Sequence, residues 1–192
     1  MVTEAPSRWN VANVVTIGRI ALVPIFAVVL LADGGHSVPW RLVAAVIFAL
    51  AALTDRVDGY LARRHNLVTE LGAILDPIAD KLLIGTALVI LSLLGELPWW
   101  VTVVILVREL GITVMRFGML RYATLPVSRG GKLKTVLQSV AIALYLLPLD
   151  ELPSWVRLVS GTVMGLAVAL TVVTGADYVR QAVRLRHDVP VR

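Results

Sequence analysis

The chain has 192 residues, of which 58% are hydrophobic, only 16% are charged and none is cysteine. This composition excludes an ordinary soluble domain, a disulfide framework and a thiolate metal site. The formal net charge of +5 is compatible with nucleic-acid binding, but the basic residues gather at the ends of apolar segments, which favours a membrane protein beside anionic lipid.

Apolar stretches follow one another along nearly the whole chain. About twenty apolar residues cross the hydrocarbon of a bilayer as a helix of roughly 30 Å. Short turns containing Pro and acidic residues occur at 33–39, 95–98 and 148–153. The predicted spans are residues 13–32, 39–62, 70–94, 98–120, 131–149 and 153–177. The sequence therefore predicts an all-α integral membrane protein with six transmembrane helices in a single domain, residues 1–192.

The distribution of charge predicts the orientation in the membrane. The three turns contain acidic residues and neither lysine nor arginine, whereas most of the basic residues fall on the opposite side. By the positive-inside rule, both termini are expected in the cytoplasm, with residues 1–12 as a juxtamembrane segment and 178–192 as a basic tail. Tryptophans at predicted helix ends, as in an interfacial aromatic belt, are Trp9, Trp40, Trp99, Trp100 and Trp155.

Four aspartates lie where the second and third predicted spans meet their cytoplasmic loop: Asp55, Asp58, Asp76 and Asp80. The members of each pair are three or four residues apart, so they share a helix face. A carboxylate at membrane depth costs on the order of 2.5–3.5 kcal/mol, and two charges 4 Å apart repel by roughly 4 kcal/mol at an effective dielectric of about 20. The cluster therefore indicates a bound divalent cation. Oxygen ligands suit Mg²⁺, Mn²⁺ or Ca²⁺ and argue against zinc.

Small residues accompany these aspartates. Gly59, Ala62 and Gly72 remove side chains beside the carboxylates and leave room for a ligand to approach the backbone. The competing interpretation makes the aspartates salt-bridge partners of nearby bases, but ion pairing alone does not account for the small residues. The bases concerned are Arg56, Arg63, Arg64 and Lys81.

Together these residues form the pattern D-x₂-D-G-x₂-A-R-x₈-G-x₃-D-x₃-D over residues 55–80. The pattern resembles the signature of the CDP-alcohol phosphotransferase family, with every signature position filled. The six-span pattern of the whole chain is also similar to that family's architecture. The resemblance implies a homodimeric membrane enzyme that transfers a phosphatidyl or similar group from a CDP-linked donor to an alcohol and releases CMP.

The resemblance also implies roles for the motif residues. It implies two bound metal ions, either Mg²⁺ or Mn²⁺. The residues that it implies as their ligands are Asp55, Asp58, Asp76 and Asp80. Asp80 is in addition the implied general base for the attacking hydroxyl. The residues implied to line the cytidine diphosphate site are Gly59, Ala62, Arg63 and Gly72. In the first span, Asn13, Thr16 and Arg19 share a face and could contact the nucleotide, although a helix N-cap at Asn13 and a snorkelling Arg19 explain them equally well.

The second half of the chain is expected to select the acceptor alcohol. Arg116, Lys132 and Lys134 are the predicted ligands of an acceptor phosphate. Arg108 is a further candidate, and with Glu109 it is expected to organise the site. The alternative is that Arg108 only pairs with Glu109 or an aspartate, and that the lysines are positive-inside anchors.

Several strings are similar to the bacterial branch of the family whose donor is CDP-diacylglycerol and whose acceptor is sn-glycerol 3-phosphate. They lie at residues 13–19, 76–82, 108–110 and 131–135. The resemblance thus implies phospholipid biosynthesis in the cytoplasmic membrane, with membrane lipids as neighbours and no nucleic acid. Alternatives are a cardiolipin or phosphatidylinositol-phosphate synthase and, outside enzymes, a membrane cation carrier that holds buried aspartates on its helices.

Overall fold

The computed structural model describes the backbone of residues 11–64, 70–119 and 129–188. Side chains are described for residues 14–54, 72, 75–115, 131 and 133–181. Over this part of the chain the fold has six α-helices, one short 3₁₀ helix and no strand. The elements are α1 (Val11–Leu31), η1 (Ala32–Gly35), α2 (Val38–Arg64), α3 (Glu70–Leu93), α4 (Trp99–Met119), α5 (Arg129–Leu146) and α6 (Ser154–Asp188).

The all-helical prediction is confirmed. The six predicted spans agree with the six helices to within three residues at every end except the last. There α6 continues to Asp188, eleven residues beyond the predicted end of the span at 177. Charged residues end the apolar run after 177, but charged residues do not end a helix. The helix continues because neither Gly nor Pro, the residues that most disfavour helix, occurs between Gly175 and Pro190. Most of the stretch predicted as a basic tail is therefore helical.

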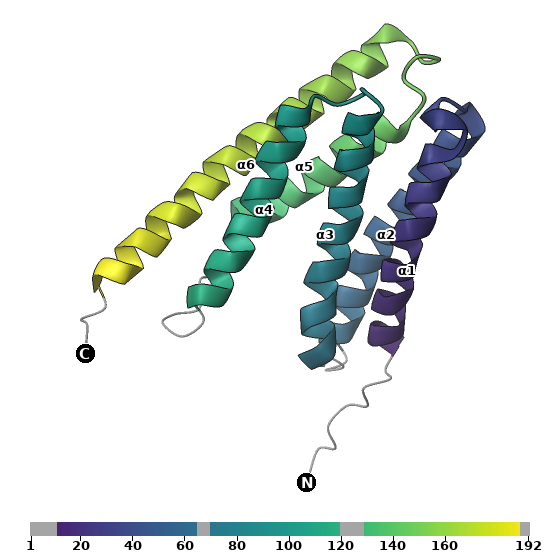
Figure 1. Ribbon diagram of the computed structural model, residues 1–192. Coiled ribbons are helices and arrows are strands. Elements are labelled where there is room, and N and C mark those ends of the chain that lie inside the picture. The colour runs from purple at the N-terminus through teal and green to yellow at the C-terminus, as the bar shows by residue number, and fades with distance from the viewer. Residues whose placement is uncertain (1–10, 65–69, 120–128, 189–192) are drawn as a thin grey trace.

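The helices run alternately up and down, and they form two groups of three (Figure 1). In the first group α1 packs against both α2 and α3, and in the second α6 packs against both α4 and α5. The groups are joined mainly through α3, which contacts α4 and α5, and through the contact of α2 with α5. Residues on α3, α4 and α5 therefore meet at the junction between the two groups.

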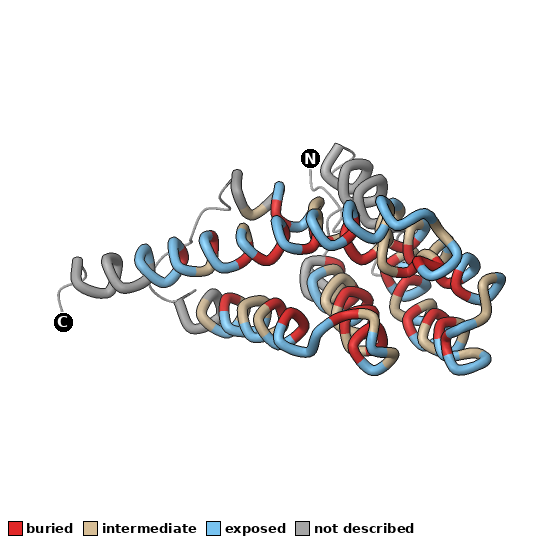
Figure 2. Tube along the Cα trace, turned by 90° about the horizontal axis from the view of Figure 1, so that it is seen from above, coloured by how far each residue is buried: buried red, intermediate tan, exposed pale blue. Residues whose placement is uncertain are grey.

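Buried residues lie mainly on the sides of the helices that face one another, and exposed residues lie mainly on the outer sides (Figure 2). Large apolar side chains that are fully buried occur on five helices and include Phe26, Phe48, Leu88, Ile105 and Ile142. The rings of Phe26 and Phe48 lie 6.0 Å apart between α1 and α2. Large apolar side chains are also exposed on each of the six described helices. So much outward-facing apolar surface is unusual for a soluble monomer.

Two of the described helices are long and apolar enough to cross a membrane. They are Val14–Gly35, with a mean hydropathy of 2.5, and Ser154–Gln181, with a mean hydropathy of 1.9. Shorter apolar helical segments occupy Val38–Thr54 and Leu133–Leu146. The structure thus shows a helical protein with two candidate membrane spans, and the six spans and their orientation stay predictions.

Arg41 holds together the turns at one end of the bundle. Its side chain is 4% exposed and forms an ion pair with Glu96, in the turn between α3 and α4. It also donates hydrogen bonds to the carbonyl oxygens of Tyr145 (2.8 Å) and Gly35 (3.4 Å). Gly35 has a φ of +78°, which strains any larger residue, and a Cβ there would lie 2.6 Å from Leu94, whose side chain would have to move.

Candidate active site

Asp76 and Asp80 lie one turn apart on α3, on the stripe that begins with the buried Gly72. Thr16 of α1 is buried, and its Oγ1 donates a hydrogen bond of 2.6 Å to Oδ1 of Asp76. A bond to an ionised acceptor is among the stronger kinds of hydrogen bond. The contact between α1 and α3 therefore fixes the orientation of the Asp76 carboxylate.

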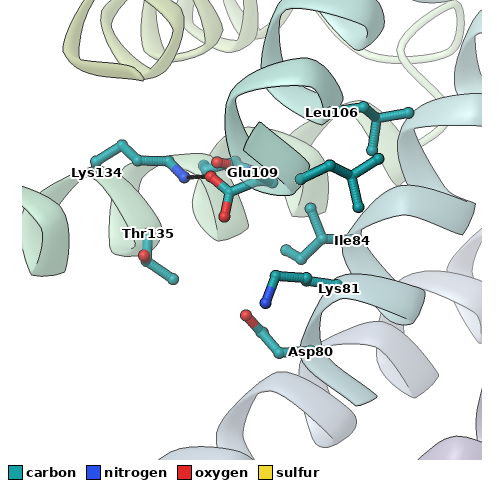
Figure 3. Close-up of a pocket in the computed structure, with 9 residues that line it drawn as sticks. Asp80, Lys81, Ile84, Leu106, Glu109, Lys134 and Thr135 are labelled. Atoms are coloured by element: carbon teal, nitrogen blue, oxygen red, sulfur yellow. Dashed lines mark hydrogen bonds and ion pairs between the residues drawn. The ribbon is translucent and has the colours of Figure 1, made fainter. Parts of the chain in front are cut away.

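A pocket opens beside Asp80, where α3, α4 and α5 meet (Figure 3). Helix α3 contributes a carboxylate and an ammonium group from Asp80 and Lys81, α4 contributes Glu109, and α5 contributes Lys134 and Thr135. The remaining lining residues are Ile84, Leu106, Leu110 and Gln138. Charged groups of both signs thus share one cavity with an apolar wall, which is the usual composition of a small-molecule site.

Glu109 connects the basic groups of this site. Its Oε1 accepts a hydrogen bond of 3.0 Å from Arg108 and forms an ion pair with Lys134 (Figure 3). The Lys134 side chain is only 3% exposed, so it is not a surface anchor facing water. Asp80 also attracts the Lys134 ammonium group, although less strongly than Glu109 does. Two cations around one carboxylate leave this cluster with a net positive charge.

Arg108 points toward α6 rather than into the pocket. Its Nη2 donates a hydrogen bond of 3.1 Å to Thr174 Oγ1, and its guanidinium carbon lies 5.8 Å from the centre of the Tyr178 ring. A Cβ at Gly175 would lie 3.2 Å from Arg108 Cγ, so the backbone of α6 approaches this side chain closely. Arg108 is thus held by Glu109 on one side and by α6 on the other.

The side chains of several predicted site residues lie outside the part of the chain for which side chains are described. They are Asn13, Asp55, Asp58, Gly59, Ala62, Arg63, Arg116 and Lys132. The backbone places 55–64 in the last turns of α2, which contacts α3. The structure therefore brings together Thr16 with Asp76, and Asp80 with Lys134 and Glu109, and it does not test the roles of the others.

The described part of the predicted metal site suits a hard divalent cation. An ionised carboxylate has about four acceptor positions, so the bond from Thr16 leaves Asp76 able to bind a cation as well. In the described part of the chain no three His, Cys, Asp or Glu side chains are grouped to hold a metal ion. Two of the four predicted ligands, Asp55 and Asp58, lie outside that part.

The first helix requires a correction. Helix α1 begins at Val11, so Asn13 is its third residue and not an N-cap. Arg19 is 3% exposed, which is the opposite of a side chain snorkelling to water. Sequence reasoning also assigned no role to Gln138, which is buried and lines the pocket. Gln138 follows Lys134 by four residues, so both lie on one face of α5. This spacing is the sequence signal that could have identified Gln138 as a site residue.

Comparison with known proteins identifies the family of this chain. The profile of the CDP-alcohol phosphatidyltransferase family matches residues 9–173. The chain belongs to this family of membrane-associated enzymes. The match includes α1 to α5 and most of α6, so the motif at 55–80 and the pocket both fall inside it.

Curated relatives carry more particular names. A Mycobacterium tuberculosis protein described as a probable phosphatidylglycerophosphate synthase is 54% identical over 175 residues, covering 91% of this chain and 82% of that protein. The Bacillus subtilis CDP-diacylglycerol–glycerol-3-phosphate 3-phosphatidyltransferase is 37% identical over 190 residues, covering 88% of this chain and 93% of that protein. The enzyme of the same name from Salmonella paratyphi A is 38% identical over 142 residues, covering 71% and 76%.

Proposed function

We propose that this chain transfers the phosphatidyl group of CDP-diacylglycerol to sn-glycerol 3-phosphate, giving phosphatidylglycerophosphate and CMP. The relatives named for this reaction match most of the chain at 37–54% identity. The single structural observation that carries the proposal is the pocket shared by Asp80 and Lys134. It joins a carboxylate of the family motif to a buried cation from a helix more than fifty residues away in sequence.

Asp80 is the general base of the proposed reaction. Its carboxylate takes the proton from the C1 hydroxyl of glycerol 3-phosphate, and the resulting alkoxide forms a bond to the β-phosphorus, which bears the diacylglycerol. The bond from that phosphorus to the bridging oxygen breaks, and CMP leaves with the electron pair. Positioning and charge stabilisation are most of what phosphoryl transfer requires.

The proposed cofactor is Mg²⁺ or Mn²⁺, as two ions, and its chemistry when bound is to neutralise the diphosphate and the departing CMP. Its ligands in this proposal are Asp55, Asp58, Asp76 and Asp80. Thr16 supports the site by orienting Asp76. The proposed nucleotide-binding residues are Gly59, Ala62, Arg63, Gly72, Asn13 and Thr16.

Lys134 is proposed to bind the phosphate of the acceptor. An ammonium group has three donors, and the ion pair with Glu109 uses one of them. The net positive charge of the Arg108–Glu109–Lys134 cluster favours a dianionic phosphate in a site poorly exposed to water. Arg116 and Lys132 complete the proposed phosphate site, and Arg108 acts by holding Glu109.

The proposed enzyme is a multi-pass protein of the cytoplasmic membrane, with six spans, both termini in the cytoplasm and one domain over residues 1–192. The exposed apolar side chains on all six described helices support this. So do the exposed tryptophans at the starts of α2, α4 and α6, which are Trp40, Trp99, Trp100 and Trp155. A homodimer is part of the proposal because the family resemblance implies one.

An acceptor screen tests this function. Purified protein in lipid nanodiscs receives CDP-diacylglycerol, Mg²⁺ or Mn²⁺, and in turn glycerol 3-phosphate, phosphatidylglycerol or inositol 1-phosphate. We expect CMP and phosphatidylglycerophosphate only with glycerol 3-phosphate. If product forms with one of the other acceptors and not with glycerol 3-phosphate, that other compound is the acceptor and the proposal is wrong. Cation flux in liposomes without CDP-diacylglycerol, together with no CMP release, would make the chain a carrier.

A further inference from the structure

Gln138, at the wall of the pocket, contains an unusual buried group. It lies one turn after Lys134 on α5, is only 2% exposed and is one of the pocket-lining residues. Its amide oxygen Oε1 is fully buried and accepts no hydrogen bond from any described residue. Buried acceptors are nearly always paired in native structures, because an unpaired one keeps the whole cost of its desolvation. The amide oxygen therefore lacks a donor, and the pocket that Gln138 lines is the adjacent space for a molecule that supplies one.

The chemistry of an amide oxygen restricts this partner. It only accepts hydrogen bonds, so the partner must bring a donor, which an ionised phosphate lacks. Oε1 of Glu109, by contrast, already has donors, since it binds Arg108 and Lys134. Thr135 also lines the pocket, but it is an exposed residue, and the proton of its hydroxyl is donated to the carbonyl of Gly131 at 3.1 Å. Gln138 is thus suited to a hydroxyl group of a bound polyol.

We propose that Gln138 accepts a hydrogen bond from the C2 hydroxyl of the acceptor and determines specificity for a glycerol phosphate. This inference rests on the proposed function, in which the phosphate binds Lys134 and the C1 hydroxyl faces Asp80. The C2 hydroxyl is then the remaining donor of the acceptor. A site built to bind a hydroxyl rejects the analogue lacking it, because the buried acceptor is left unpaired.

The test pairs a substrate change with a side-chain change. 3-Hydroxypropyl phosphate keeps the reacting hydroxyl and the phosphate but lacks the C2 hydroxyl. Gln138→Met keeps the length of the side chain and removes the amide. The control is Ser139→Ala, because the Ser139 hydroxyl donates to the carbonyl of Thr135 at 3.0 Å and does not line the pocket. The measurement is kcat/KM for both phosphates with each protein, by CMP release.

We expect the wild type to prefer glycerol 3-phosphate by about tenfold or more, which is the worth of one good hydrogen bond. Gln138→Met should lose about tenfold on glycerol 3-phosphate and less than about threefold on the analogue, while Ser139→Ala keeps the wild-type ratio. An equal loss of kcat/KM on both acceptors, or no loss on either, would overturn the assignment. Gln138 would then only pack in the helix interface or bind a water molecule.

The wild type alone gives a second check that does not depend on the variant folding. Equal use of the two phosphates by the wild type would overturn the role of Gln138 while leaving the proposed reaction intact. No CMP release with glycerol 3-phosphate, combined with release with an unrelated acceptor, would overturn the proposed function and this inference together. Thermal unfolding in the same nanodiscs checks that each variant is folded.

Discussion

Asp80 and Asp76 are neighbours on one face of α3, yet their surroundings differ. Asp76 accepts a hydrogen bond from the buried Thr16, whereas Asp80 lines the pocket that also contains Lys134. A carboxylate held by a neighbouring helix is suited to a fixed role such as metal binding. A carboxylate at a cavity wall can reach a substrate hydroxyl. These contacts support the proposal that Asp76 only binds metal, while Asp80 binds metal and also acts as the base.

Replacing Asp80 with asparagine tests the proposed base. Asp80→Asn keeps the size of the side chain and removes its ability to take a proton, so we expect turnover to fall by about 10²–10⁴. The measurement is CMP release at saturating donor and acceptor, with Asp177→Asn as control, because Asp177 is exposed on α6. A folded Asp80→Asn protein with turnover near that of the control would refute the assignment.

Glu109 is a positioning residue in the proposed reaction, because it orients Lys134 and Arg108. Glu109→Gln keeps the shape of the side chain and removes the charge that holds both cations. We expect KM for glycerol 3-phosphate to rise about tenfold while KM for CDP-diacylglycerol changes little.

Glu109→Asp supplies the matching rescue experiment. It restores the carboxylate at a shorter reach, so it should recover part of the lost affinity for the acceptor. A rise of both KM values together in Glu109→Gln, or a fall in kcat alone, would show that Glu109 does not act through the acceptor site.

At the scale of elements, the site depends on contacts between helices that are distant in sequence. Thr16 on α1 and Asp76 on α3 are 60 residues apart, and Arg108 on α4 and Thr174 on α6 are 66 apart. Each of these contacts joins polar side chains on two different helices. The helices therefore position the functional groups, and the hydrogen bonds fix their final orientation.

Thr16→Val tests the contact between α1 and α3. Valine has the same shape but cannot donate to Asp76, so the carboxylate loses its orienting bond. Loss of such a supporting group at a metal site typically costs 10–100-fold in metal affinity or activity. We expect the Mg²⁺ or Mn²⁺ concentration for half-maximal activity to rise by about tenfold or more.

The matched control is Thr162→Val, whose exposed hydroxyl donates only to Leu158 of its own helix among the described residues. It should leave the metal requirement unchanged. A Thr16→Val protein with the same metal requirement as this control would show that the bond to Asp76 does not support a metal site.

The sequence predicted most of the fold because apolar runs and turn residues are local signals. The turns at 33–39 and 95–98 contain residues with positive φ, Gly35 and Gly95 among them, as glycine-containing turns favour. The sequence analysis placed the end of α6 too early because it relied on hydropathy, which shows only where an apolar run stops. A helix can continue through charged residues until a helix-breaking residue ends it. The ion pair between Glu109 and Lys134 could not be predicted, because a local sequence pattern does not show which residues on different helices are in contact.

At the scale of the whole molecule, the two ends of the bundle have different tasks. The pocket lies where the two groups of helices meet, toward the end at which α2 and α4 finish. At the other end, Arg41 links the turn after α1, the turn after α3 and the end of α5. The contacts of Arg41 thus hold together the turns at the end of the bundle away from the pocket.

Arg41→Ala is therefore expected to destabilise the fold while leaving the chemistry in place. Removing one partner of a buried ion pair costs about 3–5 kcal/mol, because Glu96 would keep its charge with only 15% of its side chain exposed. For a protein of this size that corresponds to a fall in Tm of roughly 6 °C or more. The measurement is thermal unfolding in lipid nanodiscs, followed by CMP release well below the lowered Tm, where we expect near wild-type turnover.

Arg157→Ala is the control, since Arg157 pairs with Asp150 at the same end of the bundle but both side chains are more than half exposed. An exposed ion pair contributes about 1 kcal/mol or less, so its loss should hardly change Tm. Equal Tm values for the two variants would refute a structural role for the buried pair. A loss of turnover in Arg41→Ala at temperatures where it is folded would show instead that this end of α3 communicates with the aspartates.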